Sequence, residues 1–133
     1  MAVSFAIEVV AADRLVWVGQ AVQLIATTTE GEIGVLARHE PLIATLASGV
    51  AEIRTAEGER LIVAVDGGFL SVSPERTSII SPYAQLVSEF DPAQAEAALR
   101  AAQAKIDAGD VSQQTLTDYH HAIAQVKAAA RKG

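Results

Sequence analysis

The chain has 133 residues, half of them hydrophobic, and a formal net charge of −6. This content suffices for one packed domain with a small appendage, whereas disorder would require lower hydrophobicity and higher net charge. The acidic balance excludes duplex nucleic acid as an expected partner, because phosphate binding needs a basic face. The sequence contains no cysteine, which excludes disulfides, thiolate catalysis and cysteine-ligated zinc, and a reducing cytosol is the simplest setting.

The sequence shows no targeting or membrane segment. The opening stretch "MAVSFAIEVVAADR" lacks the basic flank and continuous apolar run of a signal peptide. No run approaches the roughly 20 apolar residues that a spanning helix needs. We therefore expect no direct insertion into a membrane, and any membrane association is expected to go through another protein.

Residues 3–80 are typical of a series of short β-strands. Residues 3–10 alternate in the period-two pattern of a half-buried strand. Similar β-branched segments follow at residues 15–19, 22–29, 50–55, 60–65, 69–73 and 77–80. The stretch "EIRTAEGERLIVAV" predicts a hairpin around Glu57-Gly58, so neighbouring strands are expected to be antiparallel. Many short strands joined by tight turns predict an antiparallel β-sandwich or flattened barrel.

After Phe90 the sequence becomes alanine-rich and helical. Asp91 is the expected N-cap of a first helix, and Gly109 is expected to end it. Asp110 is the expected cap of a second helix, which runs to the basic C-terminal end. The predicted fold class is α+β, with an N-terminal β-sandwich at residues 1–88 and a C-terminal α-helical hairpin at residues 89–133.

Each predicted helix carries an apolar stripe at three- and four-residue spacing. The first stripe consists of Ala95, Ala98, Leu99, Ala102 and Ile106, and the second of Leu116, Tyr119, Ile123 and Val126. A hairpin with alanine stripes buries little apolar area by itself. We therefore expect the hairpin to rest on the sandwich or on a partner.

The reactive motifs in the sequence are incomplete. His39-Glu40 lacks the second histidine that a metalloprotease helix places four residues on, where this chain has Ile43. His120 and His121 are about 100° apart around a helix, so we expect one at the hairpin seam and one in solvent. The stretch "VDGGFL" lacks the rest of a phosphate-binding fingerprint and predicts a tight turn. We expect no metal site, no cofactor and no catalytic site.

The segment "GEIGVLARHEPL", residues 31–42, resembles the signature G-E-x-G-x-x-x-x-H-x-P-L of the ε subunits of bacterial F-type ATP synthases. Further matches, "DRLVWVG", "VAVDGGFLSV", "GDV" and "AIAQVK", fall at the order and spacing of that family and extend the resemblance over nearly the whole chain. The resemblance implies a ten-stranded β-sandwich followed by a mobile helical hairpin.

The resemblance also implies a function in the central stalk. Members of that family are non-catalytic rotor subunits that pack on the γ subunit and sit on the membrane ring of c subunits, peripherally, at the cytoplasmic face of the plasma membrane. The implied contact with γ and the c-ring involves Glu30, Gly31, Glu32, Arg38 and His39. Their polar groups can pair with the polar loops of such a ring. For His39 the alternative is a hydrogen bond within the sandwich.

The family's hairpin is expected in a state folded against the sandwich and in an extended state that reaches the catalytic head and blocks ATP hydrolysis. Lys127, Arg131 and Lys132 are then expected to meet acidic segments of the catalytic head, which makes its α and β subunits further expected partners. The alternative for this basic end is a solvated helix terminus stabilised by the helix dipole.

Some relatives bind ATP at the hairpin through an Ile/Leu-Asp-x-x-Arg-Ala motif. Here "FDPAQA" keeps Asp91 and Ala95 but has Gln94 in place of the arginine, and the second-helix arginine positions are His121 and Gln125. The charges that would bind phosphate are missing, so we do not expect ATP to bind and interpret Asp91 as a helix cap.

Two other functions are alternatives to that of a rotor subunit. The first is a stand-alone ATP-responsive binding module. The second, a small hydrolase using Glu32 or His39, ranks last because the sequence contains no nucleophile–base constellation.

Overall fold

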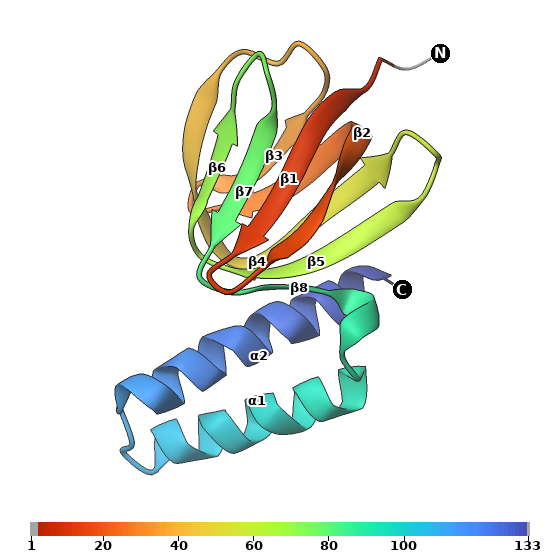
Figure 1. Cartoon of the computed structure of the whole chain (residues 1–133). Coiled ribbons are helices and arrows are strands. Elements are labelled where there is room, and N and C mark those ends of the chain that lie inside the picture. Colours follow the sequence, from red (N-terminus) through yellow and green to blue (C-terminus); the bar gives the residue numbers. More distant parts are fainter. Residues whose placement is uncertain (1–2, 133) are drawn as a thin grey trace.

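The computed structural model describes residues 3–132 and consists of a β-sandwich with two packed helices at one end (Figure 1). The strands in this range are β1 Phe5–Ala11, β2 Leu15–Thr28, β3 Gly31–Val35, β4 Leu42–Thr55, β5 Arg60–Asp66, β6 Phe69–Val72, β7 Thr77–Ser81 and β8 Ala84–Leu86. A short 3₁₀ turn, η1 Val87–Glu89, leads to α1 Pro92–Asp107 and α2 Gln113–Lys132. The predicted α+β class, a sandwich followed by a helical hairpin, is confirmed.

The strands form one sheet that folds over and closes on itself. Their order is β3-β2-β1-β7-β6-β4-β5-β8, and β2 also pairs with β4. The pairs are antiparallel except β1 with β7, which is parallel. The structure has eight strands where the family resemblance implies ten. The reason is that β2 and β4, 14 residues each, stay continuous while they pass from one layer to the other.

The core of the sandwich lies between its two layers and is made of aliphatic side chains. The largest fully buried hydrophobic residues are Ile7, Leu24, Ile53, Leu70 and Ile79. They come from five different strands. In β7, for example, the side chain of Ile79 points into the core, and the next residue, Ile80, points to the other face and is exposed. The period-two interpretation is confirmed for β1 and β7, whereas residues 62–65 of β5 are all buried because α2 covers the outer face of this strand.

The turn between β5 and β6 contains the two adjacent glycines of "VDGGFL". Gly67 and Gly68 have φ angles of 76° and 95°, in the region that favours glycine. A Cβ atom on Gly68 would lie 2.1 Å from the carbonyl oxygen of Ile80 and 2.7 Å from the Cα of Ser81. The predicted tight turn is confirmed, and the close backbone approach excludes any larger residue at position 68.

The helix ends follow local capping, with one difference from the prediction. The carboxylate of Asp91 accepts a hydrogen bond from the Ala93 amide at 2.9 Å, as predicted. At α2 the hydroxyl of Ser112 accepts from the Thr115 amide at 3.3 Å, so Ser112 caps this helix and the assignment to Asp110 was wrong. Asp110 instead accepts from the Ser112 amide at 3.0 Å and from the Thr115 hydroxyl at 2.8 Å.

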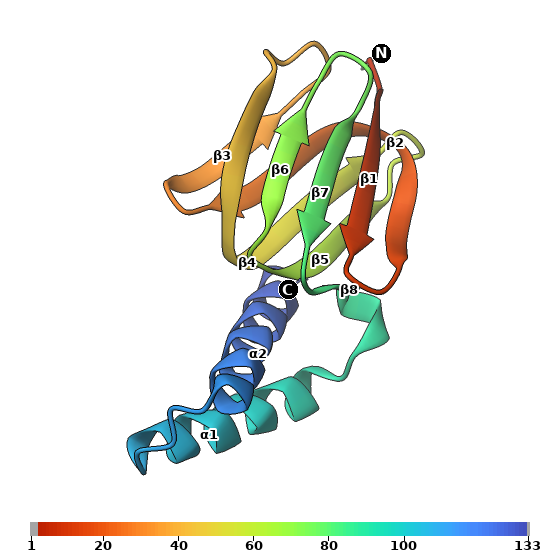
Figure 2. The ribbon, with the colours of Figure 1, turned by 60° about the vertical axis from the view of Figure 1, so that its left-hand side comes forward.

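Helix α2 lies between the sandwich and α1 (Figures 1 and 2). Its fully buried residues are Thr115, Ala122, Ala124 and Ala128. The predicted stripe of larger side chains is only partly buried, and two of its members, Tyr119 and Ile123, line an open groove with Leu99 of α1. A helix packed on two sides needs two close contacts, and small side chains allow its backbone to approach both neighbours.

Candidate functional site

The predicted docking segment, residues 31–42, is divided by strand β3. Glu30, Gly31 and Glu32 lie at the turn between β2 and β3, whereas Arg38 and His39 lie in the loop that follows β3. A strand of five residues separates the two groups by roughly 16 Å at ~3.3 Å per residue. The structure therefore places the five predicted contact residues at two separate positions.

The loop of residues 36–41 lies at the end of the sandwich farthest from the helices (Figure 1). The amide of His39 donates to the carbonyl of Leu36 at 3.2 Å, and its Nδ1 lies 2.7 Å from the carbonyl oxygen of Glu40. Arg38 is exposed and has a positive φ of 65°. His39 thus contacts its own loop, and both side chains line an open groove that also includes Arg76.

At the other end of β3, Glu32 is paired with the C-terminal helix. Arg131 Nη1 donates to Glu32 Oε2 at 2.6 Å, and Arg131 Nε donates to Glu52 Oε1 at 2.9 Å. Arg60 binds the same Glu52 carboxylate through Nε at 3.0 Å and Nη2 at 3.2 Å. We call these four residues, Glu32, Glu52, Arg60 and Arg131, the C-terminal ion cluster. Two residues predicted to contact different partners here contact each other.

The C-terminal ion cluster is built around a buried carboxylate. The hydrogen bond from Arg60 lowers the pKa of Glu52, and Arg131 acts in the same direction, against the opposing effect of burial. Arg60 also donates to the carbonyl oxygens of Arg131 at 2.8 Å and Lys132 at 3.4 Å. The last carbonyls of a helix have no partner within the helix, so Arg60 of β5 caps α2 from the sandwich.

Small apolar and polar groups make up the middle of the seam between α2 and the sandwich. Ala124 and Ala128 pack against Ile62 and Ala64 of β5. Beside them Gln125 Nε2 donates to the hydroxyl of Tyr83 at 2.8 Å and to Oε1 of Gln85 at 3.1 Å, and the Tyr83 hydroxyl donates to Gln85 at 2.6 Å. Burial raises the pKa of Tyr83. The tyrosine therefore stays a neutral donor in this seam.

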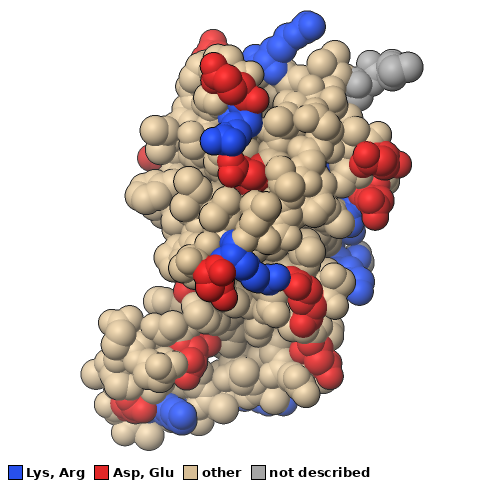
Figure 3. All heavy atoms as spheres, in the orientation of Figure 1, with Lys and Arg blue, Asp and Glu red and all other residues tan. Residues whose placement is uncertain are grey.

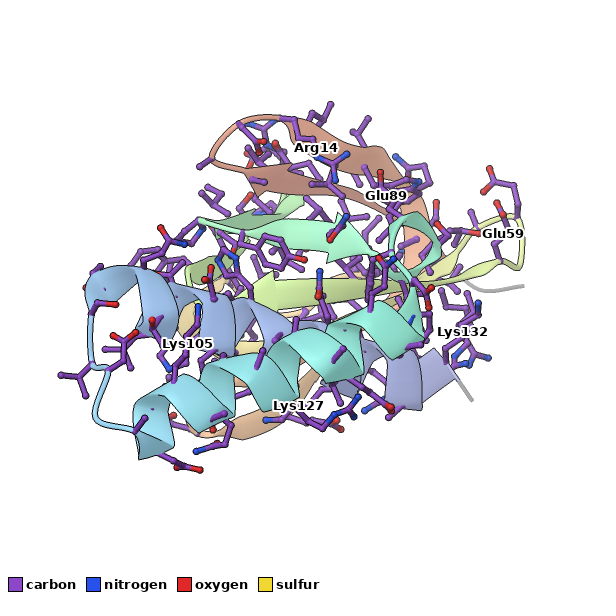
Figure 4. The ribbon with its side chains drawn as sticks, turned by 90° about the horizontal axis from the view of Figure 1, so that it is seen from below. Arg14, Glu59, Glu89, Lys105, Lys127 and Lys132 are labelled. Atoms are coloured by element: carbon purple, nitrogen blue, oxygen red, sulfur yellow. The ribbon has the colours of Figure 1, made fainter. Side chains whose placement is uncertain are left out.

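His121 forms the next contact of the seam. Its ring stacks on Tyr83 with centroids 4.1 Å apart, and its Nε2 lies 3.4 Å from Asp66 Oδ2. His120 is exposed. His121 also lines the hollow between the two helices, so the prediction of one histidine at the hairpin seam and one in solvent is confirmed. Of the other predicted hairpin residues, Lys127 Nζ lies 3.5 Å from the Ser48 carbonyl, and Lys132 is exposed at the end of α2 (Figure 4).

An ion pair fixes the connection between sandwich and hairpin. Arg14, in the β1–β2 turn, and Glu89, in η1, lie beside each other in Figure 4 and form two hydrogen bonds of 2.9 and 3.1 Å. Glu89 also accepts from the Leu86 amide at 3.1 Å, and the hydrogen bond from Arg14 lowers the pKa of Glu89. The ion pair therefore ties the last turn before the hairpin to the sandwich.

The residues considered for nucleotide binding are not gathered at one position, because His121 and Gln125 line the hollow between the helices whereas Asp91 and Ala95 do not. Asp91 caps α1, Ala95 is buried, and neither lines the hollow between the helices, where Lys105 and His121 lie. Within residues 3–132 no three histidine, aspartate or glutamate side chains are grouped so that they could hold a metal ion. In the same range no helix combines the length and apolar character needed to cross a membrane.

An exposed apolar patch on the sandwich was missed by the sequence reasoning. Phe69 of β6 lies opposite Ile80 of β7 in the register, and both are more than half exposed. Ile43 of β4, on the strand next to β6, is 77% exposed. Figure 3 shows charged side chains over the upper part of β1, β6 and β7 and an uncharged area below them. Glu8 of β1 pairs with Arg76 at 3.1 Å. The sequence signal that could have revealed this patch is the presence of large apolar residues at outward-facing positions of strands with a period-two pattern.

Comparison with known proteins identifies the family. The model of the family "ATP synthase, Delta/Epsilon chain, beta-sandwich domain" matches residues 4–87. The ATP synthase epsilon chain of Streptomyces griseus is 45% identical over 108 residues, which are 81% of this chain and 87% of that protein. The epsilon chain of Corynebacterium urealyticum is 50% identical over 101 residues, 75% and 82% of the two chains.

Solved structures show the same fold. A chain in the Euglena gracilis mitochondrial ATP synthase structure of OSCP, F1 and c-ring has a TM-score of 0.78 and 25% identity, covering 96% of this chain and 81% of that one. A chain in the central stalk and c-ring of Tetrahymena thermophila mitochondrial ATP synthase has a TM-score of 0.59 at 11% identity, covering 98% and 97%, and shows the fold alone. Together with the signature at residues 31–42, these matches show that the chain belongs to the family of ATP synthase epsilon chains.

Proposed function

We propose that this chain is a non-catalytic rotor subunit that joins the γ subunit to the c-ring in the central stalk of an F-type ATP synthase. The observation that carries the proposal is the identity of 45% over four fifths of the chain with an ATP synthase epsilon chain. The Euglena neighbour comes from an assembly that contains F1 and the c-ring, which supports the same partners here. The subunit would act peripherally at the cytoplasmic face of the plasma membrane.

The exposed apolar patch on the sandwich is the proposed surface for γ. Phe69, Ile80 and Ile43 occupy neighbouring positions on β6, β7 and β4 and are all more than half exposed. Exposed apolar residues grouped in this way are typical of protein interfaces. Replacement of one of them by a charge would place an unpaired charge in such a contact, which is costly.

The loop that carries Arg38 and His39 is the proposed contact with the c-ring. The loop lies at the end of the sandwich opposite the helices (Figure 2), so a partner there would leave the hairpin accessible from the other side. Arg38 is exposed and can pair with polar groups of a neighbouring loop. Glu30 and Gly31 are exposed at the separate β2–β3 turn and remain a second proposed contact.

The hairpin is proposed to restrain ATP hydrolysis when it leaves the sandwich. Support comes from the seam, where α2 is held by alanines, a few hydrogen bonds and the C-terminal ion cluster rather than by large apolar side chains. Such a contact can open without unfolding the sandwich. In the extended state Lys127, Arg131 and Lys132 would become available to acidic groups of the catalytic head.

Binding to γ tests the rotor proposal directly. The purified chain should capture γ at micromolar concentration, and Phe69→Glu should abolish the complex. Val111→Glu, at an exposed apolar position in the turn between the helices, serves as the matched control and should bind as the wild type does. Failure of the correctly folded wild-type chain to capture γ, with folding checked by circular dichroism, would refute the proposal.

Truncation tests the brake separately. The assembled enzyme with this subunit ended after Glu89 should hydrolyse ATP faster than the enzyme with the full chain, while ATP synthesis continues. An unchanged rate of hydrolysis would refute the brake and leave the rotor function intact.

A further inference from the structure

The C-terminal ion cluster lies where a proposed docking turn and the mobile hairpin meet. Glu32 is the second residue of β3, and Arg131 is in the last turn of α2. The guanidinium of Arg131 is shared between Glu32 at 2.6 Å and Glu52 at 2.9 Å. Charge-assisted hydrogen bonds of this length are the stronger class of polar contact in proteins. The end of α2 is therefore held by a contact with the turn itself.

We propose that the Glu32–Arg131 pair is a releasable latch, and that a basic side chain of a neighbouring protein docked at the β2–β3 turn takes over Glu32 and frees the end of α2. This inference rests on the proposed function only in assigning a role to the hairpin. In this proposal the basic side chain of the partner and Arg131 of the folded hairpin compete for the carboxylate of Glu32.

The exposure of the two carboxylates identifies Glu32 as the point of exchange. The Glu32 side chain is 53% exposed, whereas that of Glu52 is 8% exposed. A partner from solvent can therefore reach Glu32 but not Glu52. Glu30 is exposed in the same turn and adds to the negative charge that would attract a basic group.

The cluster is arranged so that Arg131 can leave at little cost. Removing one partner from a buried ion pair normally leaves a stranded charge, which is strongly destabilising. Here Glu52 keeps both hydrogen bonds to Arg60 when Arg131 departs, and Glu32 is open to water. No buried charge is left unpaired in the released state, so the latch can open and close reversibly.

The coupling is reciprocal. A basic partner that binds Glu32 more tightly when Arg131 has left will favour the released hairpin, and a hairpin folded onto the sandwich will weaken that partner by the same factor. A contact at the sandwich surface would in this way be transmitted to α2 without any change in the aliphatic core.

Hydrogen–deuterium exchange of the full chain tests the latch. Glu32→Gln should speed the exchange of amides in the last two turns of α2 by about threefold, as expected for a partly exposed charge pair. Arg131→Gln should speed it by about tenfold, because it also removes the hydrogen bond to the buried Glu52. The matched control is Lys132→Gln, which removes the same charge from the same helix end, where Lys132 forms no side-chain ion pair within residues 3–132. Sandwich amides should be unchanged in every variant.

Two outcomes would overturn the latch. One is an Arg131→Gln effect no larger than that of Lys132→Gln. The other is strict additivity in the double variant Glu32→Gln/Arg131→Gln, because residues that act on each other should give less than the sum of their separate effects.

Competition for Glu32 is tested with a tetra-arginine peptide at constant ionic strength. The peptide should accelerate exchange at the end of α2 in the wild type and leave the Glu32→Gln variant unaffected. Equal acceleration in both proteins would show that the peptide acts at another position, and would refute the proposal that it displaces Arg131 from Glu32. These experiments use the isolated chain, so their result is independent of whether truncation after Glu89 changes ATP hydrolysis in the assembled enzyme.

Discussion

The sandwich and the seam beneath it are held together by different physical means. Within the sandwich, five large side chains are at most 1% exposed, namely Ile7, Leu24, Ile53, Leu70 and Ile79. At the seam the buried side chains of α2 are alanines, supplemented by directional contacts such as Gln125 to Tyr83. Full burial of a large aliphatic side chain contributes about 1.5–3 kcal/mol, and a methyl group far less. The comparison shows that more large apolar side chains are buried within the sandwich than between the sandwich and α2.

The largest expected effect is a cavity in the sandwich. Leu70→Ala should lower the free energy of unfolding by about 2–5 kcal/mol, because Leu70 is fully buried and its neighbours cannot close the space. Denaturant titration measures the loss. Ile43→Ala, at a 77% exposed position, should change the same quantity by less than about 0.5 kcal/mol. Equal losses would show that burial in the sandwich does not govern its stability.

A charge placed at the seam should separate the two regions. Ala124→Glu puts a carboxylate where the side chain is fully buried against β5, so α2 should detach and its amides should exchange more than about tenfold faster. The denaturation midpoint of the sandwich should move little. Ala97→Glu, at an exposed position of α1, is the control and should leave exchange unchanged. If Ala124→Glu unfolds the whole chain, the two regions are one cooperative unit.

Acid should weaken the hairpin before the core. The pKa of Glu52 is lowered from its ordinary value of 4.5 in the folded state, so the stabilisation from its ionised form is complete above pH 4.5 and is lost as the pH falls below it. Arg60 of β5 and Arg131 of α2 both face Glu52, and Glu32 lies on the far side of Arg131. Exchange of α2 amides followed from pH 7 to pH 3, corrected for intrinsic rates, should show the release.

Glu89 also has a lowered pKa, caused first by its hydrogen bond from Arg14, so its protonation would weaken the structure over a similar pH range. The variant Glu52→Gln separates the contribution of Glu52 from that of Glu89. The variant should flatten the acid dependence of α2 exchange. An unchanged profile would place the acid-sensitive group elsewhere in the seam.

The smallest expected effect is the response to nucleotide. Calorimetry with ATP and Mg²⁺ should give no heat of binding below millimolar concentration, where 1 mM corresponds to roughly −4.1 kcal/mol. The reason is that Gln94, His121 and Gln125 supply no fixed positive charge for phosphate. A micromolar affinity would revive the ATP-responsive module, and Lys105→Gln would then show whether the hollow between the helices holds the nucleotide.

The sequence predicts the elements whose signals are local. Alternation located most strands, and Asp91 and Gly109 marked the ends of α1. Strand β3 escaped prediction because Gly31, Glu32 and Gly34 are exposed and Val35 alone among its five residues is fully buried. That strand depends on pairing with β2, which periodicity within five residues cannot reveal.

The candidate site was less predictable than the fold. The angle between successive helical positions sufficed to separate His120 from His121. The pairing of Glu32 with Arg131 joins residues 99 positions apart and depends on where α2 lands on the sandwich. The sequence around either residue does not specify where α2 packs on the sandwich, because the buried contacts of α2 come from alanines, and alanines occur all along the hairpin.

The parallel pairing of β1 with β7 has a consequence for how the chain is made. Ile7 pairs with Thr77, so the first strand to leave the ribosome waits for nearly the last strand of the sandwich before the sheet can close. At roughly 5–20 residues per second this delay lasts on the order of seconds. The contacts within the hairpin are short-range, so its helices can form quickly. They have no complete surface of the sandwich to pack on until the sheet has closed. Translation therefore delivers the helical hairpin last, when the surface that it packs on is complete.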